Sequence, residues 1–217
     1  MQQLIGKNIL FYALYSFFLL LALISLAAYS KMQLFEFFNA NRSAVADTFY
    51  YYLTAFGDGW FFVTLILISA FIKFRYAFTG AATYALSSLI AQGLKRLVFS
   101  GEPRPLEYFK NTAVKVYTSS GNELLSFNSF PSGHTTTVFA IACLLSLLVT
   151  NKKMAAVFLL IALLTGISRV YLGQHFLADI TAGSLIGVIS ATICYQWIIP
   201  IESTFLEKNF YPNLRKK

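Results

Sequence analysis

The sequence predicts an all-α protein: a bundle of six membrane-spanning helices, with an interfacial amphipathic segment after the first span and a catalytic loop between spans three and four. Hydrophobic residues make up 57% of the 217-residue chain and charged residues only 12%, which lies outside the range of soluble globular proteins. The apolar residues also gather in runs that charged or loop-forming residues separate. We therefore expect a single integral-membrane domain over residues 1–217.

The predicted spans differ in length and in how they end. Residues 9–29 carry no charge, and this run of about 20 residues exceeds the apolar core of a typical signal peptide, so we interpret it as a retained helix. Residues 59–73 are short for a span, but Trp60 and Arg75 can anchor its ends at the headgroups. The other spans are predicted at 76–95, 133–150, 154–168 and 176–199.

Two stretches between the spans have a different composition. Residues 31–58 mix charged side chains with the aromatic cluster 49–52, which is typical of one or two helices lying on the membrane surface. Residues 100–130 are polar and contain Gly101 and Pro103, so we predict an extramembrane loop. Within that loop the runs 114–118 and 123–127 fit a β-hairpin.

The cations follow the predicted topology. Six spans place both termini on one side, and nine of the seventeen Lys and Arg residues lie in short loops or tails on that side, which the positive-inside rule assigns to the cytoplasm. These are Lys7, Lys73, Arg75, Lys152, Lys153, Lys208, Arg215, Lys216 and Lys217. A nucleic-acid binder would gather its cations on one polar face, so the net charge of +8 predicts no nucleic-acid partner.

The same topology brings the unusual polar residues to the opposite side of the membrane. The two histidines of the chain, His134 and His175, both fall there, as does the loop 100–130. Asp179 lies four residues after His175, so on a helix beginning near His175 its carboxylate can accept a hydrogen bond from one imidazole nitrogen. We therefore expect the two histidines to share one active site.

The residues expected around these histidines indicate a phosphate ligand. Three cations, a hydroxyl and a glycine amide near a helix start favour a dianionic tetrahedral group. In such a site His175 fits a nucleophile and His134 a general acid. The acidic residues outside the pattern are scattered, so neither a metal nor another cofactor is predicted. The candidate residues are Lys95, Arg104, Ser132, Gly133, His134, Arg169, His175 and Asp179.

Two motifs resemble those of the type 2 phosphatidic acid phosphatase family, which also includes vanadium haloperoxidases and glucose-6-phosphatase-like enzymes. One is residues 131–134, Pro-Ser-Gly-His, and the other is Ser-Arg at 168–169 followed by His175 and Asp179. The resemblance implies that His175 is the nucleophile, Asp179 its partner and His134 the acid. It implies a phosphate cradle of Lys95, Arg104, Ser132, Gly133 and Arg169.

The resemblance also implies a location and a reaction. Integral-membrane members hydrolyse lipid phosphates or diphosphates at the outer face of the membrane without a metal, so we expect a bacterial inner-membrane protein with a periplasmic active site. The first family motif departs from its pattern here. Eight residues separate Lys95 from Arg104, where the family usually has six, and we expect the extra two to bulge near Gly101 and Pro103. Whether Lys95 or Arg96 supplies the cation stays open.

The sequence leaves several alternatives. We expect the substrate to be a phospholipid, isoprenoid or lipid A phosphate. Undecaprenyl diphosphate, phosphatidylglycerol phosphate, phosphatidate and lipid A all offer the same reacting group. A lipid phosphotransferase of the same fold is one alternative, and a non-catalytic membrane protein that binds anionic lipid is another. A vanadium haloperoxidase ranks last, because apolar spans point to a lipid substrate. The sequence makes no prediction of oligomeric state.

Overall fold

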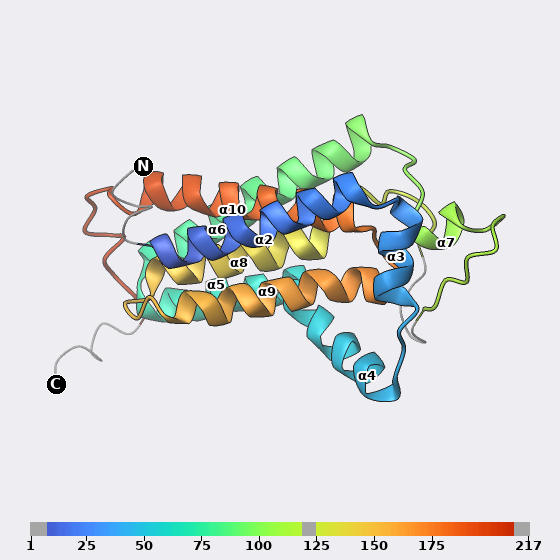
Figure 1. Ribbon diagram of the computed structural model, residues 1–217. Coiled ribbons are helices and arrows are strands. Elements are labelled where there is room, and N and C mark those ends of the chain that lie inside the picture. The colour runs from blue at the N-terminus through green and yellow to red at the C-terminus, as the bar shows by residue number, and fades with distance from the viewer. Residues whose placement is uncertain (1–7, 119–124, 211–217) are drawn as a thin grey trace.

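The computed structural model describes residues 8–118 and 125–210, which fold into helices joined by turns and loops (Figure 1). The described residues form no strand, so the predicted all-α class is confirmed for them. The helical elements are α2 (Ile9–Ala28), α3 (Lys31–Asn39), α4 (Ala44–Leu53), the 3-10 turn η1 (Thr54–Gly57), α5 (Gly59–Ile72), α6 (Phe74–Gly93), the π-helical turn η2 (Leu94–Val98), α7 (Pro105–Tyr108), α8 (Gly133–Leu148), α9 (Met154–Tyr171) and α10 (Leu177–Ile198).

The predicted hairpin in the loop 100–130 is wrong for the residues that the structure describes, and its turn, 119–124, lies outside them. Residues 114–118 form no strand, because Asn39 occupies the backbone of Tyr117: its amide nitrogen donates to the Tyr117 carbonyl at 2.7 Å and its oxygen accepts from the Tyr117 N–H at 2.8 Å. Phe127 instead forms an isolated bridge with Pro103.

Helix α8 is the centre of the bundle. Most of its side chains are buried, and α6, α9 and α10 surround it (Figure 1). Helix α10 approaches α8 closely at two glycines: a Cβ at Gly183 would lie 2.6 Å from the Ser132 carbonyl oxygen, and one at Gly187 would lie 2.4 Å from that of Thr136. Side chains at these positions would separate the helices, so the glycines allow the first turns of α8 to pack closely against the first half of α10.

The helices vary in their ability to cross a membrane. By length and apolar composition, α2, α9 and α10 each qualify. Residues 44–57 and 59–72 qualify together but are bent by 53° at their junction, and α8, with 16 residues, is shorter. These observations agree with a membrane protein, while the count of six spans stays a prediction.

The two ends of the bundle differ. Helix α2 begins and α10 ends at the left in Figure 1, and there Glu207 binds the side chains of Lys73 and Arg75. At the other end lie α3, α4, α7 and the described parts of the loop 100–130 (Figure 1). The short-loop cations and the predicted site residues therefore occupy opposite ends within the described chain.

Among the differences from the predicted boundaries, three lie close to the predicted site residues. Helix α9 continues to Tyr171, past the predicted end at 168, because the Ser168 hydroxyl donates to the Thr165 carbonyl and fits within the helix. The third predicted span, 76–95, continues beyond Lys95 through η2. Helix α10 begins at Leu177 rather than near His175, so His175 lies before its first turn.

Candidate active site

Most of the predicted site residues line one cavity of about 900 Å³ at the end of the bundle that carries α3, α4 and α7. We refer to it as the site cavity. Of the eight candidates, it is lined by Lys95, Arg104, Gly133, His134, Arg169 and His175. Ser132 and Asp179 do not line it and lie behind this surface, with exposed fractions of 0% and 4%. The structure thus places both histidines on one cavity wall.

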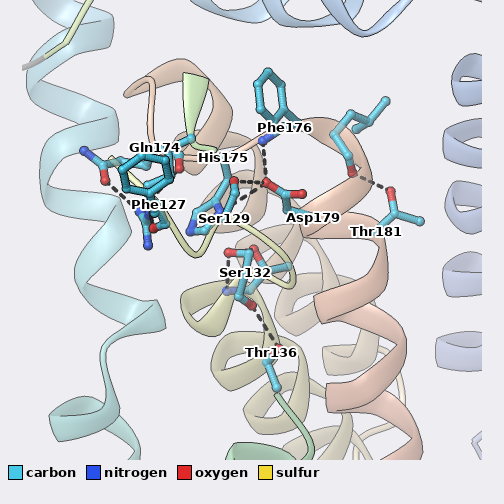
Figure 2. A network of polar contacts seen from close by, with 12 residues as sticks. Phe127, Ser129, Ser132, Thr136, Gln174, His175, Phe176, Asp179 and Thr181 are labelled. Atoms are coloured by element: carbon cyan, nitrogen blue, oxygen red, sulfur yellow. Dashed lines mark hydrogen bonds and ion pairs between the residues drawn. The ribbon is translucent and has the colours of Figure 1, made fainter. Parts of the chain in front are cut away.

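The carboxylate of Asp179 is the centre of a buried hydrogen-bond network (Figure 2). Its Oδ2 faces Nδ1 of His175 at 3.3 Å and accepts from the Ser129 hydroxyl at 2.5 Å and from the Phe176 N–H at 2.9 Å. The bond to Phe176 also satisfies a free amide at the start of α10, which is why the helix begins after His175. The His175–Asp179 contact predicted from helical spacing therefore arises from a helix cap.

The surroundings of His175 favour its neutral form. The side chain is 2% exposed, and burial lowers the pKa of His175 to about 3, against the opposing effect of Asp179 and with further lowering by Arg104 and Arg169. The ordinary value is 6.5, so the unliganded imidazole is uncharged at neutral pH. With Nδ1 turned to a carboxylate, the tautomer with a proton on Nδ1 leaves Nε2 with a free electron pair.

Ser132 fixes the position of His134 through the backbone. It is the N-cap of α8, and its hydroxyl oxygen accepts from the N–H of Thr135 at 3.4 Å and from the Thr135 hydroxyl at 3.0 Å. Its own N–H donates to the carbonyl of Asp179 at 3.1 Å (Figure 2 shows Ser132 beneath Asp179). One hydrogen bond thus joins the two segments that carry the histidines.

Two buried guanidinium groups face the site cavity. Arg104 and Arg169 are each 6% exposed, and burial lowers the pKa of Arg104 below its ordinary value. Nη1 of Arg104 donates to the side-chain and main-chain oxygens of Gln174, at 3.0 and 3.3 Å. Nη1 of Arg169 donates to the Thr54 hydroxyl at 2.6 Å. All three of these hydrogen bonds go to uncharged oxygens and neutralise no charge, so the cavity is suited to an anion.

Comparison with known protein families shows to which family the chain belongs. The model of the PAP2 superfamily matches residues 74–201, which is more than half of the sequence. The chain belongs to the PAP2 superfamily. The crystal structure of Aquifex aeolicus LpxE is similar, with a TM-score of 0.65 and 27% sequence identity over 79% of this chain and 99% of that one.

Curated PAP2 relatives include enzymes named for lipid substrates. A lipid A 1-phosphatase of Rhizobium etli is 36% identical over 112 residues, which cover 52% of this chain and 44% of that protein. The undecaprenyl-diphosphatase BcrC of Bacillus subtilis is 25% identical over 160 residues, covering 73% and 78%. The chain spans between a third and a half of the length of the curated relatives it matches first.

The chain leaves α-helical winding within the first predicted motif. It does so in η2, at Leu94–Val98, before the turn at Gly101, whose φ is positive, and the bulge expected near Gly101 and Pro103 stays a prediction. A π-turn inserts residues without breaking the helix, and such turns are frequent at functional sites. Here it brings both Lys95 and Arg96 to the site cavity, the former half-buried and the latter exposed.

Sequence reasoning missed three residues of this PAP2 site. Ser129 donates to Asp179, Gln174 accepts from Arg104, and Thr54 accepts from Arg169. Ser129 and Gln174 adjoin the motif residues, so their positions gave a local signal. Thr54 gave none, because it lies 115 residues from its partner and before the segment that the PAP2 model matches.

The described part of this PAP2 chain also contains no group of three or more His, Cys, Asp or Glu side chains placed to hold a metal ion. Asp58 is the acidic residue among those that line the site cavity. Metal-independent activity stays a prediction.

Proposed function

We propose that the protein is a membrane lipid phosphatase that hydrolyses a phosphomonoester or diphosphate lipid at the outer, periplasmic face of a bacterial inner membrane. The reaction proceeds through a phosphohistidine and needs no metal. The observation that carries the proposal is the meeting of His134, His175 and the cations Lys95, Arg104 and Arg169 at one cavity. An anion receptor alone would need the cations but neither histidine.

The contacts of His175 support its role as nucleophile. Asp179 faces Nδ1, so Nε2 is the nitrogen available to the cavity that His175 lines. Burial keeps the imidazole neutral, which a nucleophile requires, and Asp179 stabilises the cation that forms on attack. The buried Arg104 and Arg169 would bind the phosphate oxygens and stabilise the charge that develops on them.

The proposed reaction has two steps. His175 Nε2 attacks phosphorus and the bond from phosphorus to the lipid oxygen breaks. His134, whose protonated form is favoured by the bound phosphate anion, donates its proton to that oxygen. The leaving group is a lipid alcohol, or a lipid monophosphate when the substrate is a diphosphate. His134 then takes a proton from water, the resulting hydroxide attacks phosphorus, and the phosphorus–nitrogen bond breaks to release inorganic phosphate and free His175.

A turnover panel tests this function and its substrate together. We would measure phosphate release in detergent with EDTA present from lipid A, undecaprenyl diphosphate, phosphatidylglycerol phosphate and phosphatidate. We expect turnover of at least one, with inhibition by vanadate, which mimics the trigonal-bipyramidal phosphoryl group. An absolute requirement for a divalent metal would contradict the proposal. A lipid-acceptor-dependent product with little free phosphate would identify a phosphotransferase instead.

The kcat/KM of Lys95→Met is expected to be about 10-fold lower than that of Arg96→Met. The reason is that a buried charge contributes more to binding an anion than an exposed one. Both side chains line the site cavity, but Lys95 is half-buried whereas Arg96 is exposed. Steady-state kinetics of the two variants on the best lipid would decide between them. A larger loss from Arg96→Met would assign the first-motif cation to Arg96.

A further inference from the structure

A short turn outside the family motifs contacts two residues of the site. The 3-10 turn η1, Thr54–Gly57, joins α4 to α5 where the chain bends by 53°. It packs against α8 and α9, and Thr54 and Ala55 line the site cavity. The turn lies before residues 74–201, so the family match assigns nothing to it.

The first contact is a hydrogen bond to a guanidinium group. Nη1 of Arg169 donates to the Thr54 hydroxyl at 2.6 Å, while Nε of Arg169 is buried without a partner among the described residues. The geometry of a guanidinium group is planar, so fixing Nη1 restricts the direction of the remaining N–H groups. Thr54 therefore determines how Arg169 presents its other donors to the cavity.

The Thr54 hydroxyl makes a different hydrogen bond from the hydroxyls of most described threonines in helices. The hydroxyls of Thr48, Thr64 and Thr79 each donate to the carbonyl four residues earlier, at 2.7–2.9 Å. That local bond is the usual arrangement for threonine in a helix. In the described structure the Thr54 hydroxyl is bonded to Arg169, so its role is not explained by the helix that it ends.

The second contact is a close approach to His134. A Cβ at Gly57 would lie 2.8 Å from both the Cβ and the carbonyl oxygen of His134. The Cβ and the carbonyl oxygen are fixed by the backbone of His134 and cannot rotate away. A side chain at Gly57 would therefore displace either η1 or the first turn of α8. The backbone of η1 thus forms one wall against which His134 rests.

We propose that η1 is a positioning element of the active site, in which Thr54 orients Arg169 and Gly57 sets the position of His134. Thr54 acts through Arg169 and is therefore a positioning residue. The inference rests on the proposed phosphatase function for its kinetic effects. Its effect on anion binding follows from the Thr54–Arg169 contact alone.

The test compares two replacements at one position. Thr54→Val keeps the shape and removes the hydroxyl, whereas Thr54→Ser keeps the hydroxyl. We expect Thr54→Val to lower kcat/KM and to weaken vanadate inhibition by about 10-fold each, with Thr54→Ser within about three-fold of wild type. Thr48→Val is the matched control on α4 and should change neither, because Thr48 is exposed and bonds within its own helix.

A double-mutant cycle separates positioning from general support of the fold. If Thr54 acts through Arg169, Thr54→Val should cost little more once Arg169 is Lys, so the two losses should be strongly non-additive. Additive losses, or Thr54→Val kinetics equal to wild type, would overturn the inference. Gly57→Ala should lower kcat in a variant whose melting temperature shows that it is folded. A kcat equal to that of wild type in this folded variant would reject the proposed role of Gly57 in positioning His134.

A second readout distinguishes failure of this inference from failure of the proposed function. Vanadate affinity, measured as a rise in melting temperature, does not require turnover. Absence of turnover in wild type on every lipid would reject the phosphatase proposal. A weaker vanadate response in Thr54→Val than in wild type and Thr54→Ser would still support η1 as a positioning element, and equal responses would reject it.

Discussion

Replacing His175 with Asn is expected to abolish lipid phosphate turnover, by roughly 10⁴-fold or more, because the variant has no nucleophile at phosphorus. Asparagine is the closest polar replacement, since its amide can still donate to Asp179 from near the position of Nδ1. The fold should therefore survive, and a melting temperature measured in detergent checks that. Residual turnover above about one per cent of wild type in a folded His175→Asn protein would reject the phosphohistidine mechanism.

His134→Asn is the informative partner of that variant. The second step needs His134 to take a proton from water, so the phosphohistidine should accumulate in His134→Asn and be absent from His175→Asn. Radiolabelled phosphate bound to protein and stable in alkali measures the intermediate. A substrate with a good leaving group, such as p-nitrophenyl phosphate, should favour the accumulation, because departure of that group needs little help from an acid.

Replacing Asp179 with Asn is expected to lower kcat by roughly 10²- to 10⁴-fold with a smaller change in KM. The carboxylate oxygen faces His175 and accepts from Ser129 and Phe176. An amide in its place loses the negative charge that stabilises the histidinium formed on attack, and it favours the wrong imidazole tautomer. Steady-state kinetics and the rate of phosphohistidine formation would measure the loss.

Ser129→Ala provides a graded comparison for Asp179→Asn. It removes one donor to the carboxylate but leaves the carboxylate and its contact with His175, so we expect a loss of only about 3- to 10-fold. A loss in Ser129→Ala as large as that in Asp179→Asn would show that orientation of the carboxylate, rather than its charge, matters most. Unchanged kcat in Asp179→Asn would contradict the assigned role of Asp179.

The helical fold and the gathering of the histidines were predictable from hydropathy and spacing. The apolar runs gave the bundle helices, and two matched motifs gave His134, His175 and Asp179. The contact of His175 with Asp179 was expected for the wrong local reason, because helical spacing does not distinguish a pair within a helix from a carboxylate that caps the next one.

The parts that escaped prediction depend on tertiary contacts or on hydrogen-bond register. Thr54 lies 115 residues from Arg169 and outside both motifs, so no local pattern links that pair. Ser129 lies 50 residues from Asp179, and only its place beside the motif at 131–134 pointed to it. The π-helical winding of η2 could not be predicted either, because the sequence of Leu94–Val98 does not show whether its carbonyls bond four or five residues ahead. The cation alternatives Lys95 and Arg96 stayed open for this reason.

The length of α8 has a consequence for the bilayer itself. With 16 residues and a rise of about 1.5 Å per residue, α8 is about 24 Å long, whereas the hydrocarbon core of a typical bilayer is about 30 Å thick. If α8 crosses the membrane as predicted and Lys152 and Lys153 hold its far end at the headgroups, the reacting phosphate must descend several ångströms or the membrane must thin around the site. Turnover should then fall as the host lipids are lengthened, which makes membrane thickness a determinant of the rate.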